Sequence, residues 1–355
     1  MRVLIIDYKL RDYRIPVFEL LAKVSCIDLT IGYWFKSVVP KNVTFKTRFL
    51  YTRKIYKTFV HPNLLSICNE YDVVIAQTPL HWFSISKMAF SKERKFKFIY
   101  WTIGVRASYN SSFDKQNFIL EKLSHFFYKK ADAMLFYTSY PVKKFINSGF
   151  DKESLFVANN TIVPFQKNTE SIYNRDILIF VGTLYKGKKV ELLLEAYNEV
   201  YRMNSRIPNL HIVGDGSEFE AIRDWILNHN LENKIILEGA IFEEEKLSVL
   251  FRQSIACISP NQAGLTVQKS MAYGVPFITY KYAITGGERL AIEHNYNGVL
   301  FDDFSDLRDI LSDLSVNKEK YLEMGENAKS YYNQYSTPEI MIKGFIDVLN
   351  YVQKK

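Results

Sequence analysis

Three features that often identify a class of protein are absent from this 355-residue chain: long apolar runs, paired cysteines and acidic metal-binding pairs. No apolar run approaches the roughly 20 residues that a membrane-spanning helix needs, so we expect no such helix. The three cysteines, Cys26, Cys68 and Cys257, have no paired spacing, which favours reduced thiols in a cytosolic protein over a disulfide framework or a metal site. We find no Asp-x-Asp pair, no internal repeat and no low-complexity tract.

The chain is long enough for two domains, each with its own core. Two domains of about 150–180 residues suit this length, and 48% of the residues are hydrophobic, as in globular proteins. The polar stretch 164–175 is the best candidate for a linker. We therefore predict an N-terminal domain over 1–165, a second domain over 166–336, and a last segment over 337–355 whose helix begins at Pro338 after a capping hydroxyl.

Short apolar runs alternate with helical patterns in both halves. In the second half, three runs end at glycine-containing turns: Asp176–Val181, Leu210–Val213 and Ile235–Leu237. Further strands are expected at Ile27–Ile31, Val73–Ala76, Phe98–Trp101, Ala133–Tyr137, Phe156–Ala158 and Phe277–Tyr280, and a helical pattern covers Phe113–Lys129. Such repeated units indicate an α/β fold with parallel sheets covered by helices. Ligands bind these sheets beyond the carboxyl ends of the strands.

The stretch Ser259–Pro276 is the most informative part of the chain. The buried-strand pattern Ile255–Ile258 runs into it, and small residues then lead to a helix that opens near Gly264. A strand, a flexible turn and a helix N-terminus direct free N–H groups to one point, which attracts phosphate. The basic loop Lys186–Lys189 follows another strand and is expected at the same edge. The alternative is an ordinary strand–helix unit without a ligand.

Four motifs, in this order, resemble those of the family 4 glycosyltransferases. They are Val181-Gly182-x-Leu184 with Lys188, Gly214-x-Gly216, Ala263-Gly264-Leu265 leading to Met271-Ala272-x-Gly274-x-Pro276, and Asn297-Gly298 before an apolar pair. The resemblance covers about 177–314 and is weaker in the N-terminal half. It implies the GT-B architecture, in which two Rossmann-like domains with parallel sheets face each other across a cleft. It also implies a nucleotide sugar held mainly by the C-terminal domain, retention of anomeric configuration, and a final helix that crosses back to the N-terminal domain.

The resemblance also implies roles for individual residues. Lys188 matches the family's lysine and would act on the leaving diphosphate, although a solvated loop lysine is the alternative. The implied donor-binding residues are Gly182, Thr183, Gly214, Gln262, Ala263, Gly264, Leu265, Thr266 and Lys269. The family's two glutamates correspond to Asn261, which can still bond to a sugar hydroxyl, and to Lys269, which cannot accept a hydrogen bond from a ribose. Glu288 is predicted to replace part of their function, or else to be an acid at a helix N-terminus.

The absence of Asp-x-Asp predicts a metal-independent mechanism. Cationic side chains and helix N-termini then have to stabilise the leaving diphosphate. Retaining enzymes of the family are thought to let that phosphate accept the proton of the incoming hydroxyl, so no pair of catalytic carboxylates is needed. We expect no cofactor, because the nucleotide-diphosphate sugar is a substrate.

Basic charge is concentrated in the N-terminal half. Residues 1–165 carry 25 Lys and Arg against 12 Asp and Glu, a net charge of +13, whereas the remaining 190 carry 21 against 26, a net charge of −5. Aromatic residues are interleaved with the lysines of 36–57, which suits an anionic membrane surface; a solvated basic face is the alternative. No nucleic-acid-binding motif is present, so nucleic acid is not expected as a partner. The resemblance places the acceptor in this half, with Tyr13, Arg14 and His81 as candidate residues.

The function predicted from the sequence is that of a cytosolic retaining glycosyltransferase, peripherally bound to the inner face of the cell membrane. It would move a hexose-type sugar from a nucleotide-diphosphate donor to a lipid-linked saccharide during assembly of O-antigen, capsule or exopolysaccharide. Two alternatives stay open. One is a transferase-like protein that binds a sugar or a partner without turnover, and the other is a nucleotide-sugar epimerase of the same architecture.

Overall fold

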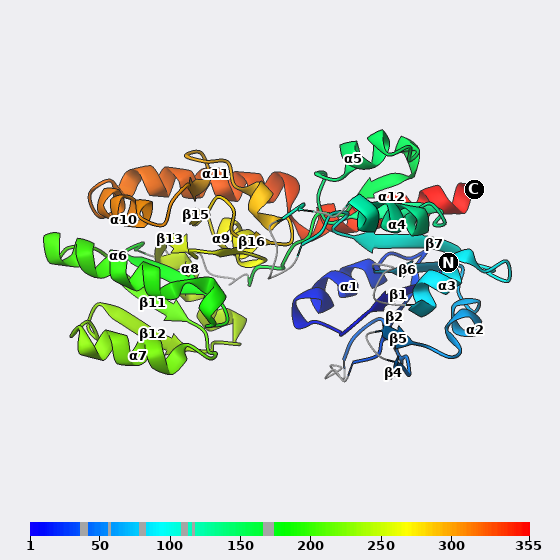
Figure 1. Ribbon diagram of the computed structural model, residues 1–355, viewed down its shortest axis with the longest axis horizontal. Coiled ribbons are helices and arrows are strands. Elements are labelled where there is room, and N and C mark those ends of the chain that lie inside the picture. The colour runs from blue at the N-terminus through cyan, green and yellow to red at the C-terminus, as the bar shows by residue number, and fades with distance from the viewer. Residues whose placement is uncertain (36–41, 56–57, 78–82, 108–112, 116–117, 166–173) are drawn as a thin grey trace. The chain divides into compact units, whose positions relative to one another are not determined.

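The chain forms two compact units (Figure 1). The computed structural model describes residues 1–35, 42–55, 58–77, 83–107, 113–115, 118–165 and 174–355. The first unit contains Met1–Arg106, Asp114–Val163 and Thr337–Lys355, and the second is formed mainly by Pro164–Ser336. The chain therefore leaves the first unit near Val163 and returns to it at Thr337.

The first unit is built on a parallel sheet. Among the described residues, seven strands lie in the order β3-β2-β1-β6-β7-β8-β9, and every neighbouring pair is parallel. They are β1 (Arg2–Asp7), β2 (Asp28–Tyr33), β3 (Lys46–Phe49), β6 (Val73–Ala76), β7 (Lys97–Thr102), β8 (Ala133–Phe136) and β9 (Leu155–Val157). An antiparallel pair lies apart from it, β4 (Arg53–Ile55) with β5 (Thr58–Val60). The helices are α1 (Ile15–Ala22), α2 (Leu64–Cys68), α3 (Phe83–Phe90), α4 (Phe118–Tyr128), α5 (Val142–Asn147) and α12 (Pro338–Lys354).

Both faces of this sheet are buried, which explains the continuous apolar runs in its strands. Successive residues of β1 point to opposite faces, so Val3 belongs to one hydrophobic cluster and Leu4 to the other. Helix α12 covers one face, where the Phe345 ring lies 5.1 Å from Trp101. Gly344 permits the approach, because a Cβ there would lie 2.1 Å from the carbonyl oxygen of Val157. The end of the chain thus belongs to the core of the first unit.

The second unit has the strand order of a dinucleotide-binding fold. Its six-stranded sheet, within the described residues, runs β12-β11-β10-β13-β15-β17, with all neighbours parallel. The strands are β10 (Ile177–Val181), β11 (Asn209–Val213), β12 (Ile235–Gly239), β13 (Ser254–Ile258), β15 (Phe277–Tyr280) and β17 (Gly298–Phe301), and β14 (Gln262–Ala263) pairs separately with β16 (Ile284–Thr285). The helices are α6 (Val190–Met203), α7 (Phe219–Asn228), α8 (Glu244–Gln253), α9 (Thr266–Ala272), α10 (Asp306–Val316) and α11 (Lys318–Tyr335). The strand order reverses between β10 and β13, and such a switch point is where these sheets bind ligands.

The basic stretch 36–57 is partly a sheet edge. Lys46 and Arg48 lie on β3 and pair with Asp28 at 2.8 Å and Glu70 at 2.6 Å, while Phe45 is buried. Lys36, Lys41 and Lys57 lie outside the described residues. In the part of the chain that the structure describes, no helix combines the length and the apolar character needed to cross a bilayer.

Candidate active site

The loops that leave β10 and β11 run side by side at the carboxyl edge of the second sheet. The Gly182 amide donates to the Val213 carbonyl at 2.9 Å, and the Leu184 amide donates to the Asp215 carbonyl at 2.9 Å. A Cβ at Gly214 would lie only 2.0 Å from the Gly182 carbonyl oxygen, and Gly214 has φ +154°. Glycine is therefore required there by both space and backbone conformation. The exposed Thr183 lies between these contacts, at the surface of the same edge.

Lys188 is buried at the switch point. It ends the helical turn Lys186–Lys188, and only 7% of the residue is exposed. Its Nζ lies 5.5 Å from the centre of the Phe180 ring, and a Cβ built on Gly182 would come within 2.5 Å of it. The ammonium therefore lies against the end of β10. The interpretation of Lys188 as a solvated loop lysine is wrong, because the residue is buried against the end of β10.

In the part of the chain that the structure describes, no counter-ion accompanies this buried charge. Within the described ranges, no carboxylate forms an ion pair with Lys188. Burial lowers the pKa of Lys188 to about 8, although Cys257 nearby opposes the shift. Burial also raises the pKa of Cys257 to about 12, so its thiol is neutral near pH 7 and does not balance the ammonium. A buried cation without a partner, at the ligand-binding edge of the sheet, is the electrostatic arrangement expected for an anion site.

Hydrogen bonds tie the loop after β13 to the turn that carries Lys188. The Asn261 side-chain amide donates to the Gly187 carbonyl at 3.0 Å, and the Tyr185 hydroxyl donates to Gln262 Oε1 at 3.2 Å. Ala263, which is buried, then leads through Gly264 into α9, whose start is formed by Leu265 and Thr266. A Cβ at Gly264 would meet no atom within 4 Å. The structure therefore brings Lys188, Asn261, Gln262 and open space beside Gly264 to one edge.

Glu288 has a structural role in the neighbouring loop. Its Oε2 accepts from the Gly286 amide at 2.9 Å and from the Thr285 hydroxyl at 3.3 Å. This loop is joined to the previous one, because β16 pairs with β14 and the Ile284 amide donates to the Asn261 carbonyl at 3.0 Å. Glu288 thus stabilises the start of its own turn.

Lys269 is held by a carboxylate that the sequence reasoning missed. Its Nζ lies 2.7 Å from both carboxylate oxygens of Glu244, at the start of α8. The Lys269 side chain is 15% exposed and that of Glu244 is 51% exposed. Because Lys269 stands where the family has a glutamate, the sequence could have indicated an acidic partner close to it. Three consecutive glutamates, 243–245, were the visible source of one.

Of the three acceptor candidates of the first unit, Tyr13 and Arg14 are described by the structure. Arg14 is ion-paired with Asp7, donates to the Tyr137 hydroxyl at 3.0 Å and lies 4.4 Å from the Trp101 ring. Burial opposes its charge, but Tyr137 and Asp7 outweigh burial and raise the pKa of Arg14. Arg14 is thus buried at the carboxyl ends of β1 and β8, beside the half-buried Tyr13. His81 lies outside the described residues.

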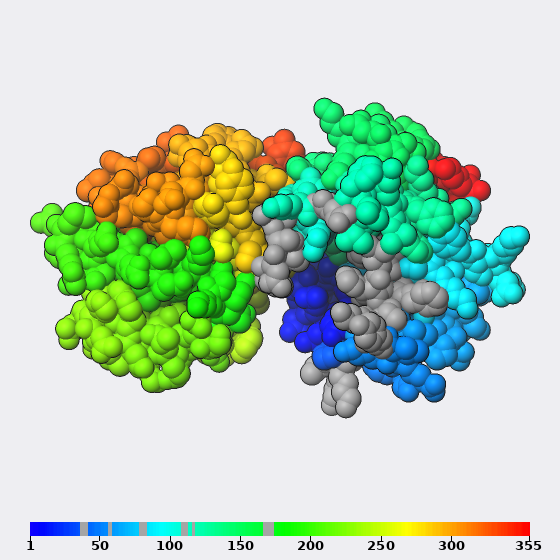
Figure 2. Space-filling model, in the orientation of Figure 1, coloured from blue at the N-terminus to red at the C-terminus, as the bar shows by residue number. Residues whose placement is uncertain are grey.

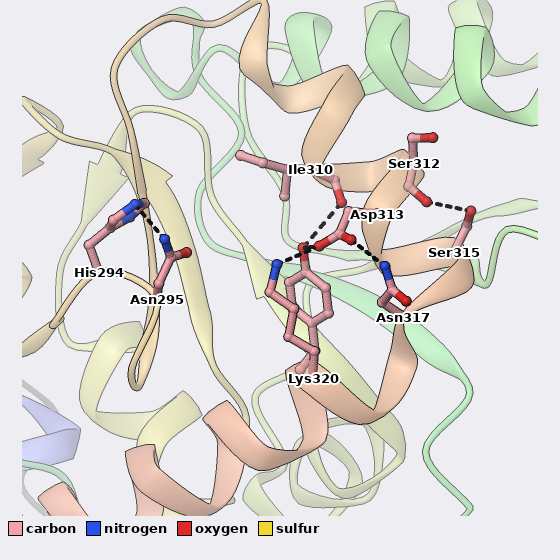
Figure 3. A network of polar contacts seen from close by, with 9 residues as sticks. His294, Asn295, Ile310, Ser312, Asp313, Ser315, Asn317 and Lys320 are labelled. Atoms are coloured by element: carbon pink, nitrogen blue, oxygen red, sulfur yellow. Dashed lines mark hydrogen bonds and ion pairs between the residues drawn. The ribbon is translucent and has the colours of Figure 1, made fainter.

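A cavity of about 340 Å³ in the second unit lies apart from these residues (Figure 3). Its most connected side chain is Asp313, which accepts from Lys320 at 2.7 Å, from the Tyr321 hydroxyl at 2.9 Å and from the Asn317 side-chain amide. Burial raises the pKa of Asp313, but these hydrogen bonds outweigh burial and hold it below its ordinary value. The network therefore joins α10 to α11. Among the described residues, no three His, Cys, Asp or Glu side chains are placed together to hold a metal ion.

Comparison with solved structures identifies the class of fold. HepE of Anabaena, solved in complex with UDP, superposes with a TM-score of 0.71 at 15% identity, over 99% of this chain and 100% of HepE. The lipopolysaccharide outer core galactosyltransferase WaaB superposes with a TM-score of 0.65 at 16% identity, over 98% of this chain and 99% of WaaB. The predicted α/β fold of the GT-B class is confirmed.

The sequence comparisons find similarity to one family. Residues 164–331 match the family described as glycosyl transferases group 1. The uncharacterized glycosyltransferase MJ1178 of Methanocaldococcus jannaschii is 25% identical over 204 residues, which are 55% of this chain and 54% of that protein. The match thus spans about half the length of that relative. The family match over residues 164–331 includes all four motifs, so this part of the chain is similar to the glycosyl transferases group 1, as the motifs indicated.

Proposed function

We propose that this protein is a retaining glycosyltransferase that takes its sugar from a nucleotide-diphosphate donor held by the second unit. The observation that carries this proposal is the buried, unpaired ammonium of Lys188 beside Gly182, at the switch point of the sheet. HepE, solved with UDP and similar in fold over nearly the full chain, supports uridine diphosphate as the nucleotide. The family 4 motifs around Gly214 and Gly264 support the retaining class.

The proposed mechanism uses Lys188 to stabilise the leaving group. As the bond between the sugar C1 and the diphosphate oxygen breaks, negative charge grows on that oxygen, and a preorganised cation stabilises it. The acceptor hydroxyl oxygen bonds to C1 on the same face of the sugar, and its proton passes to the departing phosphate. No protein nucleophile and no metal ion take part in this proposal.

A thermal stability screen tests the proposal. Uridine diphosphate at saturating concentration should raise the melting temperature of the purified protein more than guanosine or adenosine diphosphate, since a ligand that binds only the folded state stabilises it. The shift should persist in EDTA. Loss of the shift in EDTA with recovery by magnesium or manganese contradicts the metal-free mechanism. Stabilisation without release of UDP from any UDP-hexose favours a sugar-binding protein without turnover.

Nucleotide affinity should depend on pH through Lys188. The pKa of Lys188 is about 8 in the free protein, and a bound diphosphate favours the charged amine. Above about pH 8, binding must therefore take up a proton, and the affinity for UDP should fall as the pH rises from 7 to 9. Calorimetric titrations of UDP at pH 9, in buffers of different ionisation enthalpy, should report this proton uptake. An affinity that is constant between pH 7 and 9 would remove Lys188 from the diphosphate site.

Asn261 and Glu288 should affect the choice of donor sugar more than nucleotide affinity. A polar group that faces a sugar hydroxyl discriminates strongly against analogues that lack it. Asn261→Ala and Glu288→Gln should therefore lower turnover of UDP-hexoses at least about tenfold while UDP affinity stays within about twofold. Asn327→Ala is a matched control, because Asn327 also makes a single side-chain bond to a carbonyl, that of Tyr296, but on α11. A fall in UDP affinity as steep as the fall in turnover contradicts the sugar-facing roles.

Glu244 is proposed to take over the ribose contact that Lys269 cannot make. The ion pair holds a half-exposed carboxylate at the start of α8, and only the acid of the pair can accept a hydrogen bond from a hydroxyl. Glu244→Leu should weaken UDP binding about tenfold, because a leucine side chain cannot accept a hydrogen bond from a hydroxyl. Calorimetry with UDP and with 2′-deoxy-UDP checks this: the variant should lose the preference for the ribose. Equal preference in variant and parent contradicts the assignment.

The acceptor is proposed to be a lipid-linked saccharide at the inner face of the cell membrane, in the assembly of a surface polysaccharide. The net charge of +13 over residues 1–165 supports an anionic surface as the place of action. The fold shared with WaaB, a lipopolysaccharide outer core galactosyltransferase, agrees with this pathway. In the first unit, the cluster of Arg14, Asp7 and Tyr137 would form the floor of the acceptor site.

A further inference from the structure

Helix α4 of the first unit turns its apolar side outward. The exposed fractions are 68% for Phe118, 73% for Ile119, 43% for Leu123 and 56% for Phe126. These residues follow the i, i+1, i+5, i+8 spacing of one helix face. Figure 2 shows α4, in blue-green, at the surface of the first unit. An amphipathic helix that packs on a core normally has the opposite orientation.

The inward face of α4 carries the polar groups. Glu121 forms an ion pair with Lys144 at 3.1 Å, and the His125 ring lies 4.8 Å from Phe145. Tyr128 is buried and its hydroxyl lies 3.5 Å from that of Thr102. The helix is thus anchored in the unit through its polar side, and its apolar side is available to something else.

Aromatic rings from α3 extend this apolar face. Phe90, at the end of α3, is 39% exposed, and its ring lies 5.2 Å from Phe126 and 5.4 Å from Phe127. We call the exposed side chains Phe90, Phe118, Ile119, Leu123 and Phe126 the α4 face. Large apolar groups that are exposed singly are ordinary, but a contiguous group of them marks an interaction surface.

The charges around the α4 face are positive. Lys122 Nζ lies 4.3 Å from the centre of the Phe118 ring, and Lys130 Nζ lies 5.4 Å from that of Phe90. Lys87 and Lys129 are exposed nearby in sequence. The carboxylates of this region are already engaged, since Glu121 and Asp114 both pair with Lys144. Apolar side chains beside lysines match a bilayer interface with anionic headgroups, where rings enter the acyl boundary and ammonium groups meet phosphates.

We propose that the α4 face is the surface by which this protein binds an anionic bilayer. This proposal rests on the proposed function, because a lipid-linked acceptor requires contact with the membrane. It places that contact on α4 and not on the basic stretch 36–57. In that stretch, Lys46 and Arg48 are already paired with carboxylates of their own unit.

Vesicle sedimentation tests the proposal. The full-length protein should co-sediment with vesicles of phosphatidylcholine and phosphatidylglycerol, and less with phosphatidylcholine alone. Replacing three residues, Phe118→Gln, Ile119→Gln and Phe126→Gln, should lower the partition coefficient at least about tenfold, because binding follows the apolar area buried. A matched control replaces Met203, Phe242 and Val316 of the second unit with Gln; these are 67%, 88% and 70% exposed. The control should bind vesicles like the parent.

The same proteins separate failure of this proposal from failure of the proposed function. Stabilisation by UDP should be equal in parent, variant and control. If UDP stabilises the protein but the parent sediments with neither kind of vesicle, the α4 face is not a membrane surface. The same conclusion follows if the double change Arg53→Glu with Lys54→Glu abolishes vesicle binding and the α4 variant does not. A parent that is dimeric by analytical ultracentrifugation, with a monomeric α4 variant, shows instead that a second copy covers the face.

Fluorescence quenching tests the proposal with a variant that keeps the α4 face apolar. Tryptophan introduced by Phe126→Trp should be quenched by brominated phosphatidylcholine in the anionic vesicles, after subtraction of the signal of the four native tryptophans. Phe242→Trp, in the second unit, should not be quenched. Equal quenching of the two, or of neither, overturns the proposal.

Discussion

Lys188→Met should lower the release of UDP from a UDP-hexose by two to three orders of magnitude, the range seen when one preorganised electrostatic contact is removed. The same change should make the ligand-free protein more stable at pH 7. The pKa of Lys188 falls from 10.5 to about 8 on folding, so at pH 7 its buried charge costs on the order of 3 kcal/mol. Methionine keeps the apolar stem and removes that charge.

The sign of this linkage gives a pH test of the same variant. Between about pH 8 and 10.5 the unfolded chain binds a proton at Lys188 that the folded protein does not, so stability of the parent should rise with pH over this window. The advantage of Lys188→Met should therefore shrink as the pH rises from 8. Urea denaturation at pH 7 and pH 9.5 measures it. Lys186→Met, an exposed lysine of the same turn, is the control and should change neither activity nor stability. Activity of Lys188→Met within about threefold of the parent would contradict its role in catalysis.

Gly214→Ala and Gly264→Ala should have opposite effects. At Gly214, a Cβ would lie 2.0 Å from the Gly182 carbonyl oxygen on a backbone with φ +154°, so we expect a loss of at least about 3 kcal/mol in the free energy of unfolding. At Gly264, a Cβ would meet nothing within 4 Å, so stability should stay within about 0.5 kcal/mol. The affinity of Gly264→Ala for UDP should nevertheless fall at least about tenfold, because the methyl group would enter the space proposed for the diphosphate.

Chemical denaturation and calorimetry with UDP separate the two glycines. Gly239→Ala is a useful comparison, because its Cβ would also meet nothing within 4 Å but its φ of +70° strains any other residue. It should lose stability and, after correction for the folded fraction, keep its UDP affinity. If Gly264→Ala binds UDP like the parent, the diphosphate does not lie at the start of α9.

The sheets were predictable from sequence because their strands are buried on both faces. Val73–Ala76 and Phe277–Tyr280 were predicted with the bounds that the structure has, since a continuous apolar run between polar turns leaves little choice. The three-residue strands β4 and β5 were not predicted, because they are too short to show alternation or a continuous apolar run. The helix predicted over Phe113–Lys129 forms as α4 over Phe118–Tyr128, and the prediction was wrong for residues 113–115, which are not helical.

The burial and contacts of individual side chains could not be predicted from the sequence. The motif placed Lys188 at the right edge of the sheet, but its burial depends on the loop of Gly182 closing over it, which is a tertiary contact. Glu244 was missed because it lies 25 positions from Lys269 and reaches it only through the packing of α8 beside α9. The apolar pattern of α4 predicted an amphipathic helix, and only the fold shows that its apolar side faces outward.

The central claim, that the chain transfers sugar from a nucleotide-diphosphate donor with retention, is tested most directly by the anomer that it releases. Purified protein should be incubated with α-linked UDP-glucose, UDP-galactose and UDP-N-acetylglucosamine in EDTA, and the first sugar formed by slow hydrolysis should be followed by proton NMR before mutarotation. We expect UDP release from at least one donor, with the α-anomer appearing first and with at least about a hundredfold less of this activity in Lys188→Met. Appearance of the β-anomer first, or hydrolysis only when a divalent metal is added, would contradict it.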